Sequence, residues 1–135
     1  MYFYDIHYPM INKLAENIST NLINDVICLI SERVSRFNPN LCALFDVHSD
    51  HVGLGVIFQE LGSYLGDLFG LEPDLQITQE ISTIFELLED VLVSCGPEDQ
   101  VAIASSFFEE VPILAITSYL SSIGPTTLDL LEHLD

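Results

Sequence analysis

The sequence has very few basic residues. Lys13, Arg33 and Arg36 oppose 21 acidic side chains, so the formal net charge is -18 at pH 7. A field of this sign repels nucleic acids and anionic membranes and attracts basic proteins. High solubility or a salt-rich habitat is the alternative explanation. Because the chain is also 49% hydrophobic, we favour a basic protein partner, without direct binding to nucleic acid or membrane.

The sequence also lacks the features of secreted and membrane proteins. Residues 1–10 contain neither a basic region nor a long apolar run, which argues against a signal peptide. The longest charge-free run, residues 111–128, contains Pro112, Gly124 and Pro125 and is a poor candidate for a membrane helix. Three cysteines without CxxC spacing do not suggest a disulfide framework. We therefore expect a cytoplasmic protein.

Motifs of known enzyme classes are missing. The sequence contains no G-x-S-x-G, P-loop or H-E-x-x-H pattern. The adjacent Glu109 and Glu110 point about 100° apart on a helix, so they do not form a paired acid–base site. Three basic side chains are few for holding an anionic substrate. We therefore expect a protein without enzymatic activity and without a cofactor.

One short segment has the chemistry of metal ligands. Asp46, His48, Asp50 and His51 lie close together in the sequence, and carboxylate and imidazole groups are common zinc ligands. Their spacing matches no established metal motif, and polar residues also form loops and helix caps. We predict no bound metal, and we expect Ser49 or Asp50 to cap the following helix.

Helical periodicity is the main feature that the sequence does contain, and it is clearest in residues 76–96. The apolar positions recur at three- and four-residue steps within an arc of about 120°, as in a helix that faces a core. They are Ile77, Ile81, Ile84, Phe85, Leu88, Val91, Leu92 and Cys95. We expect Ile81, Phe85, Leu88 and Leu92 to form the centre of the core. Glu86 and Asp90 point the opposite way, Glu80 and Glu89 lie on the flanks, and Gly96 is a helix-stop signal.

Similar spacing predicts further helices. They are expected over residues 10–37, 41–45, 51–69, 97–111 and 113–123, followed by a last helix that Thr126 or Thr127 caps. The first is either one helix or two that break at residues 19–21, and residues 38–40 are expected to end it. Pro112 kinks or ends the helix that precedes it. With no alternating strand, we predict one all-α domain, residues 1–135, of six or seven helices packed as a bundle or as short helical repeats.

Three glycines lie on one line of the helix predicted over residues 51–69. Gly55, Gly62 and Gly66 each cost about 1 kcal/mol relative to alanine in a helix interior. Their alignment therefore indicates a backbone that packs closely against another helix of the fold.

Acidic residues cover the expected outer sides of two consecutive helices. The candidate partner-binding residues are Glu86, Glu89, Asp90, Glu98, Asp99, Glu109 and Glu110. A rival patch consists of Asp46, Asp50, Glu60 and Asp67. A solvated face is the simpler interpretation, but the lysines that normally alternate with such carboxylates are almost absent.

Several segments of the second half carry a resemblance to a known class. They are FELLED at residues 85–90, SFFEEVP at residues 106–112 and IGP before the last amphipathic helix. With these segments the chain resembles small acidic helical immunity proteins of bacterial contact-dependent or polymorphic toxins. The resemblance implies tight binding to a cognate toxin domain, with its active site blocked, and a basic nuclease would suit the charge. Two alternatives stay open, a phage-type nucleic-acid mimic that inhibits a defence or DNA-binding protein, and a helical adaptor.

Overall fold

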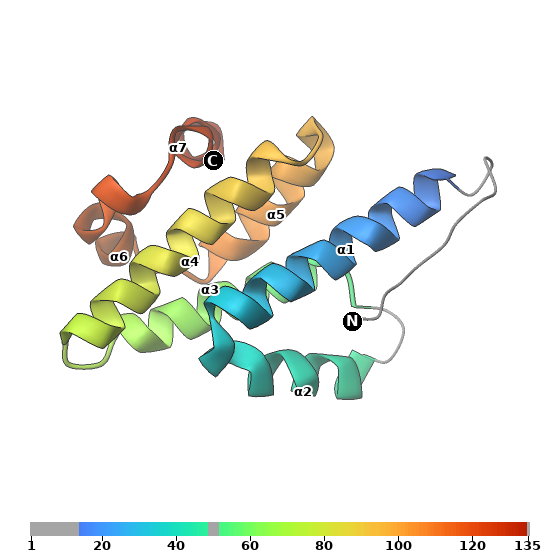
Figure 1. Cartoon of the computed structure of the whole chain (residues 1–135). Coiled ribbons are helices and arrows are strands. Elements are labelled where there is room, and N and C mark those ends of the chain that lie inside the picture. Colours follow the sequence, from blue (N-terminus) through green and yellow to red (C-terminus); the bar gives the residue numbers. More distant parts are fainter. Residues whose placement is uncertain (1–13, 49–51, 135) are drawn as a thin grey trace.

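The computed structural model describes residues 14–48 and 52–134, and α-helices make up most of it (Figure 1). In chain order the elements are α1 (Leu14–Arg33), the 3-10 helix η2 (Ser35–Phe37), α2 (Asn38–His48), α3 (Leu54–Phe69), α4 (Leu75–Val93), α5 (Pro97–Glu109), α6 (Ile113–Ser118), the 3-10 helix η3 (Leu120–Ser122) and α7 (Pro125–Glu132). Neither described range contains a β-strand. The all-α fold predicted from the sequence is confirmed.

Helix α4 is the centre of the fold (Figure 1). It packs on α3 and α5, with α1 along one flank and α7 and η3 along the other. Ile81, Phe85, Leu88 and Leu92 are at most 1% exposed, which confirms the predicted centre of the core. Leu87 is equally buried, although the sequence pattern left it out. Because α4 has neighbours on both flanks, its buried arc widens to about 160°.

Among the described residues, α3 and α5 share the most extensive contact between two helices, and the glycine line of α3 lies in it. A Cβ atom on Gly62 would lie only 2.3 Å from the carbonyl oxygen of Phe107. Gly55 also faces α5, and Gly66 faces the residues that follow α5. The prediction of close backbone packing is therefore confirmed.

The helices of the first half begin and end at positions that differ from the prediction. Helix α1 continues through residues 19–21, so the single-helix alternative is correct. Residues 38–40 begin α2 rather than ending a helix, and α2 continues to His48. Pro39 suits a first turn because its missing N–H would have no intrahelical acceptor there.

The start of α3 also differs from the prediction. The helix begins at Leu54, and Gly53 is its N-cap. The proposed caps Ser49 and Asp50 lie outside the described residues. An extended backbone at Gly53, with φ of -100° and ψ of 174°, turns the chain into the helix without a side-chain cap.

In the second half, α5 begins at residue 97 as predicted and Pro112 lies between two helices, but several other expectations are wrong. Pro97 is in the first turn of α5, and Pro112 separates α5 from α6. Gly96 does not end α4, because α4 ends at Val93 and Gly96 is the N-cap of α5. None of the helices in residues 14–48 and 52–134 has the length and hydropathy of a membrane span.

Three apolar residues in the segments predicted as helices over residues 97–111 and 113–123 are exposed. Val101 is on the solvent side of α5, Ile113 begins α6 and Leu120 is in η3. The short α6 buries Ala115 instead. A six-residue helix has room for little more than one inward-facing turn, so the continuous helical spacing predicted for residues 113–123 was wrong.

Candidate partner-binding surface

Both arginines of the described residues are held by acidic residues of α4. Arg33 Nη1 lies 2.6 Å from Asp90 Oδ2, and Arg36 Nη1 lies 3.2 Å from Glu80 Oε1. The Arg33–Asp90 pair is half exposed, so it contributes about 0–1 kcal/mol. The described residues form no other ion pair than these two. None of the other described acidic side chains therefore forms an ion pair with a described basic residue. They face solvent or accept hydrogen bonds from neutral donors.

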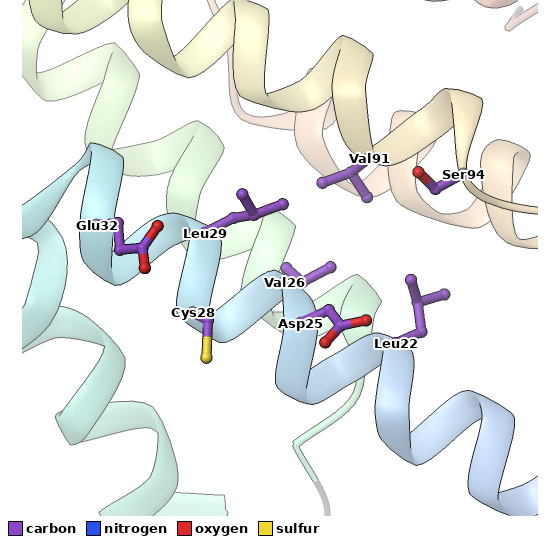
Figure 2. Close-up of a pocket in the computed structure, with 8 residues that line it drawn as sticks. All are labelled: Leu22, Asp25, Val26, Cys28, Leu29, Glu32, Val91 and Ser94. Carbon is purple, nitrogen blue, oxygen red and sulfur yellow. The ribbon is translucent and has the colours of Figure 1, made fainter. Parts of the chain in front are cut away.

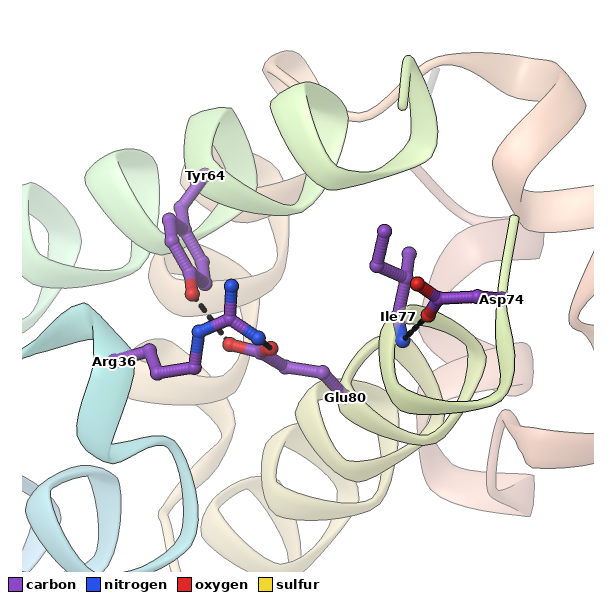
Figure 3. A network of polar contacts seen from close by, with 5 residues as sticks. All are labelled: Arg36, Tyr64, Asp74, Ile77 and Glu80. Atoms are coloured by element: carbon purple, nitrogen blue, oxygen red, sulfur yellow. Dashed lines mark hydrogen bonds and ion pairs between the residues drawn. The ribbon is translucent and has the colours of Figure 1, made fainter. Parts of the chain in front are cut away.

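Glu80 belongs to a network inside the fold rather than to an outer acidic face (Figure 3). Its side chain is 9% exposed, and it accepts hydrogen bonds from Arg36 and from the Tyr64 hydroxyl. Burial of the hydroxyl, together with this hydrogen bond, raises the pKa of Tyr64 above its usual value. The protonated Tyr64 thus acts as a donor that links α3 to α4, and Arg36 links η2 to the same carboxylate.

Glu89 is turned toward the first turn of α7. Its Oε1 accepts hydrogen bonds from the backbone N–H and from the hydroxyl of Thr127, both at 2.8 Å, and its Oε2 accepts from the N–H of Thr126 at 3.1 Å. Burial alone would raise the pKa of Glu89, but these hydrogen bonds outweigh it and lower the pKa. Glu89 is therefore an ionised carboxylate at the positive end of α7.

This arrangement corrects the prediction that Thr126 or Thr127 caps the last helix. The N-cap of α7 is Gly124, which makes no side-chain hydrogen bond, and α4 supplies the carboxylate instead. A Cβ atom on Gly124 would lie 2.3 Å from the Glu89 side chain. The glycine thus leaves room for the carboxylate, and Glu89 is bound within the fold.

The structure separates the other candidate residues into two groups. Glu86 is exposed on the outer side of α4, and Glu98 and Asp99 are exposed in the first turn of α5. Glu109 and Glu110 lie at the opposite end of α5, about 16 Å further along its axis. The exposed candidate residues therefore lie at both ends of α5 and on the outer side of α4.

Glu109 and Glu110 lie beside part of the rival patch. The side-chain amide of Gln59 donates to both carboxylates at 3.5 Å. Glu60 lines the same surface hollow as Glu110, and it accepts a hydrogen bond from Asn40 at 3.2 Å. Asp46 is exposed on α2 and Asp67 is exposed on α3, while Asp50 lies outside the described residues.

The proposed metal-ligand segment is described only in part. Asp46 and His48 are in the last turns of α2, and Asp50 and His51 lie outside the described ranges. Within residues 14–48 and 52–134, no three His, Cys, Asp or Glu residues are arranged to hold a metal ion. The absence of a bound metal therefore stays a prediction.

A groove between α1 and the C-terminal half of α4 adds two acidic residues that sequence reasoning missed (Figure 2). It encloses about 400 Å³ and is lined by Leu22, Asp25, Val26, Cys28, Leu29, Glu32, Val91 and Ser94. Val26 and Val91 form its buried floor, and Asp25 and Glu32 are exposed at its rim. The signal in the sequence was their seven-residue spacing beside the apolar ridge of α1, which places both on one side of the helix.

Comparisons of the chain with protein-family models, with curated proteins and with solved structures found no match. The resemblance to immunity proteins and the absence of enzymatic activity therefore stay predictions.

Proposed function

We propose that this protein is a non-enzymatic binding protein that inhibits a basic protein, a cognate bacterial nuclease toxin, by covering its active-site surface. The observation that supports this proposal is that both described arginines pair with carboxylates of the same chain, at Asp90 and Glu80. The carboxylates of Glu86, Glu98 and Asp99 are left exposed without basic partners among the described residues. A basic protein surface provides the charge that they lack.

The charge distribution fits fast association with such a partner. An excess of one sign steers an oppositely charged protein toward the complex, and the association rate then falls as salt is added. A long-lived complex additionally needs a smaller group of residues that becomes buried and excludes water. The exposed carboxylates suit the first requirement, and the apolar groove between α1 and α4 suits the second.

The structure sharpens the choice of residues for a test. Glu89 caps α7 and Asp90 binds Arg33, so reversing their charge would disturb the fold as well as any interface. Within residues 14–48 and 52–134, Glu86, Glu98 and Asp99 have no side-chain hydrogen bond or ion pair to another helix, and all three are exposed. They are the charged residues that we assign to the partner-binding surface.

The test begins with capture of a partner from host extract at low salt on the immobilised full chain. The captured protein is purified, and its nuclease activity is measured against increasing amounts of the inhibitor. We expect a basic protein that is inhibited at a one-to-one ratio. Reversal of Glu86, Glu98 and Asp99 to Lys should slow association at least tenfold and weaken inhibition.

The matched control reverses three exposed carboxylates elsewhere, at Asp67, Glu72 and Glu132. Its net charge changes by the same amount, so a loss confined to the first variant assigns the surface. Equal losses of association rate and inhibition in the two variants would show that only the overall charge matters. Failure to recover any basic protein would overturn the proposed function, and recovery of a DNA-binding or defence protein would favour nucleic-acid mimicry instead.

A further inference from the structure

We propose that the groove between α1 and α4 holds an amphipathic helix of the basic partner, with two basic residues seven positions apart and apolar residues between them. The inference rests on the proposed function, because it names the part of the partner that the acidic protein holds. Figure 2 shows Leu22, Val26 and Leu29 along α1 with Val91 facing them from α4.

The floor of the groove requires apolar groups in its occupant. Val26 and Val91 are 1% and 2% exposed, while Leu22 and Leu29 are only partly buried. The open space above this floor is about 400 Å³. Covering the exposed parts of the leucines would contribute about 25 cal/mol for each Å² of apolar surface.

The rim of the groove requires positively charged groups in its occupant. Asp25 and Glu32 are exposed, and neither forms an ion pair with another described residue. The nearby Arg33 is held by Asp90, which connects the same two helices. Because seven residues are close to two helical turns, the two rim carboxylates lie on one side of α1, about 10 Å apart.

The 10 Å spacing favours a helical occupant. Basic residues at positions i and i+7 of a helix are also about 10 Å apart and point the same way, and positions i+3 and i+4 lie between them on that face. In an extended strand, residues on one face are about 7 Å or 13 Å apart, which matches the spacing less well. A helix can thus place a basic residue at Asp25 and at Glu32 while its apolar residues enter the groove.

The groove also leads to one of the residues predicted from the sequence. Leu22 lines a second hollow, which Asp99 lines as well. The acidic first turn of α5 is therefore next to the end of the groove. A further basic residue of the bound helix would meet Asp99 there.

The test titrates the isotope-labelled full chain with a synthetic helical peptide and follows its amide signals by NMR. The peptide carries Lys at i and i+7, Leu at i+3 and i+4, and Ala or Gln elsewhere. A matched peptide keeps the composition and the seven-residue lysine spacing but has the lysines on the face opposite the leucines. We expect shifts around Leu22, Val26 and Leu29 with the first peptide, and at least tenfold weaker binding of the second.

Two variants of the protein test the rim charges. Asp25→Asn with Glu32→Asn should weaken binding of the first peptide at least tenfold. Asp67→Asn with Glu72→Asn removes the same charge from exposed positions elsewhere and should leave binding unchanged. Equal affinity for the two peptides, equal effects of the two double variants, or shifts centred on α2 and α3 would each overturn the proposal.

Other occupants give their own results in the same titration. Groove signals that shift with protein concentration in the absence of peptide would identify a second copy and overturn the proposal. Binding that appears only after deletion of residues 1–13 would identify that segment as the occupant and overturn it too.

The groove assignment and the proposed function can be contradicted independently of each other. If a captured partner is inhibited equally by the unchanged protein and by the Asp25/Glu32 variant, the function stands and the groove assignment falls. If the first peptide binds the groove as expected but no basic protein is inhibited, the groove assignment stands and the function falls.

Discussion

Glu89 and Thr127 join α4 to α7 through a single carboxylate oxygen. Glu89 Oε1 accepts hydrogen bonds from both the N–H and the hydroxyl of Thr127, which is fully buried. A buried hydroxyl and a buried N–H each need an acceptor, and here one side chain from another helix serves both. Sequence reasoning had placed Glu89 with the partner-binding residues, whereas its position gives it a role in the fold.

Replacing Glu89 with Ala should therefore destabilise the protein. The change removes three hydrogen bonds and leaves the start of α7 without an acceptor. Loss of a cap costs about 0.5–2 kcal/mol, and a buried unsatisfied group costs about 1–3 kcal/mol, so we expect about 2–4 kcal/mol by urea unfolding. The exposed neighbour Glu86→Ala should change stability by less than about 0.5 kcal/mol. Equal unfolding midpoints for the two variants would contradict the cap.

The same carboxylate should make stability depend on pH. The pKa of Glu89 is lowered from its usual value of about 4.5, so the unfolded chain takes up the proton at a higher pH than the folded protein does. Its stabilisation is present above about pH 4.5 and is lost as the pH falls through the folded-state pKa. We expect the stability difference between the unchanged protein and Glu89→Gln to shrink below about pH 4.5. A difference that is constant down to about pH 3 would contradict this.

Gly62 and Gly66 should respond in opposite directions to Ala. At Gly62 the new Cβ would meet the Phe107 carbonyl oxygen at 2.3 Å, and moving α5 away costs about 1–3 kcal/mol by overpacking. At Gly66 the nearest atom is 3.4 Å away, so the gain in helix propensity of up to about 1 kcal/mol should prevail. Thermal unfolding of the two variants compares them directly. A stabilised Gly62→Ala variant would show that the α3–α5 contact is looser than described.

Phe85→Ala should be among the most destabilising single changes in α4. The ring is fully buried, and its centroid lies 6.1 Å from that of Phe107 and 6.3 Å from that of Tyr119. Emptying such a site costs about 3–5 kcal/mol. Phe45→Ala on α2 is the control, because that ring is 37% exposed and should cost much less. Retention of the full melting temperature by Phe85→Ala would place the core elsewhere.

Tyr64→Phe should destabilise the protein by about 1–3 kcal/mol, because Glu80 then loses a donor in a nearly buried position. Tyr119→Phe offers a matched control, since the Tyr119 hydroxyl forms no side-chain hydrogen bond within the described residues. Chemical unfolding of both variants measures the difference. Equal stability of the two would indicate that the Tyr64 hydrogen bond contributes nothing.

Local sequence features were enough for the helical class, the buried face of α4 and the glycine contact. Periodicity is a property of one helix, so Ile81, Phe85 and Leu88 could be assigned to the core without knowledge of any neighbour. Prolines 97 and 112 act on their own backbone and marked helix boundaries correctly. The roles of Gly96 and of the two threonines in the first turn of α7 were predicted wrongly, because caps depend on where the preceding and neighbouring helices lie.

The acidic surface was decided only by tertiary structure. Glu86 and Glu89 differ by about 60° around α4, yet one is exposed and the other binds α7. A helical pattern gives the direction of a side chain but not which element lies along that direction. The pairing of Arg33 with Asp90 and the groove at Asp25 likewise arise where α1 meets α4. These two helices are distant in the sequence, and the packing of the whole chain brings them into contact.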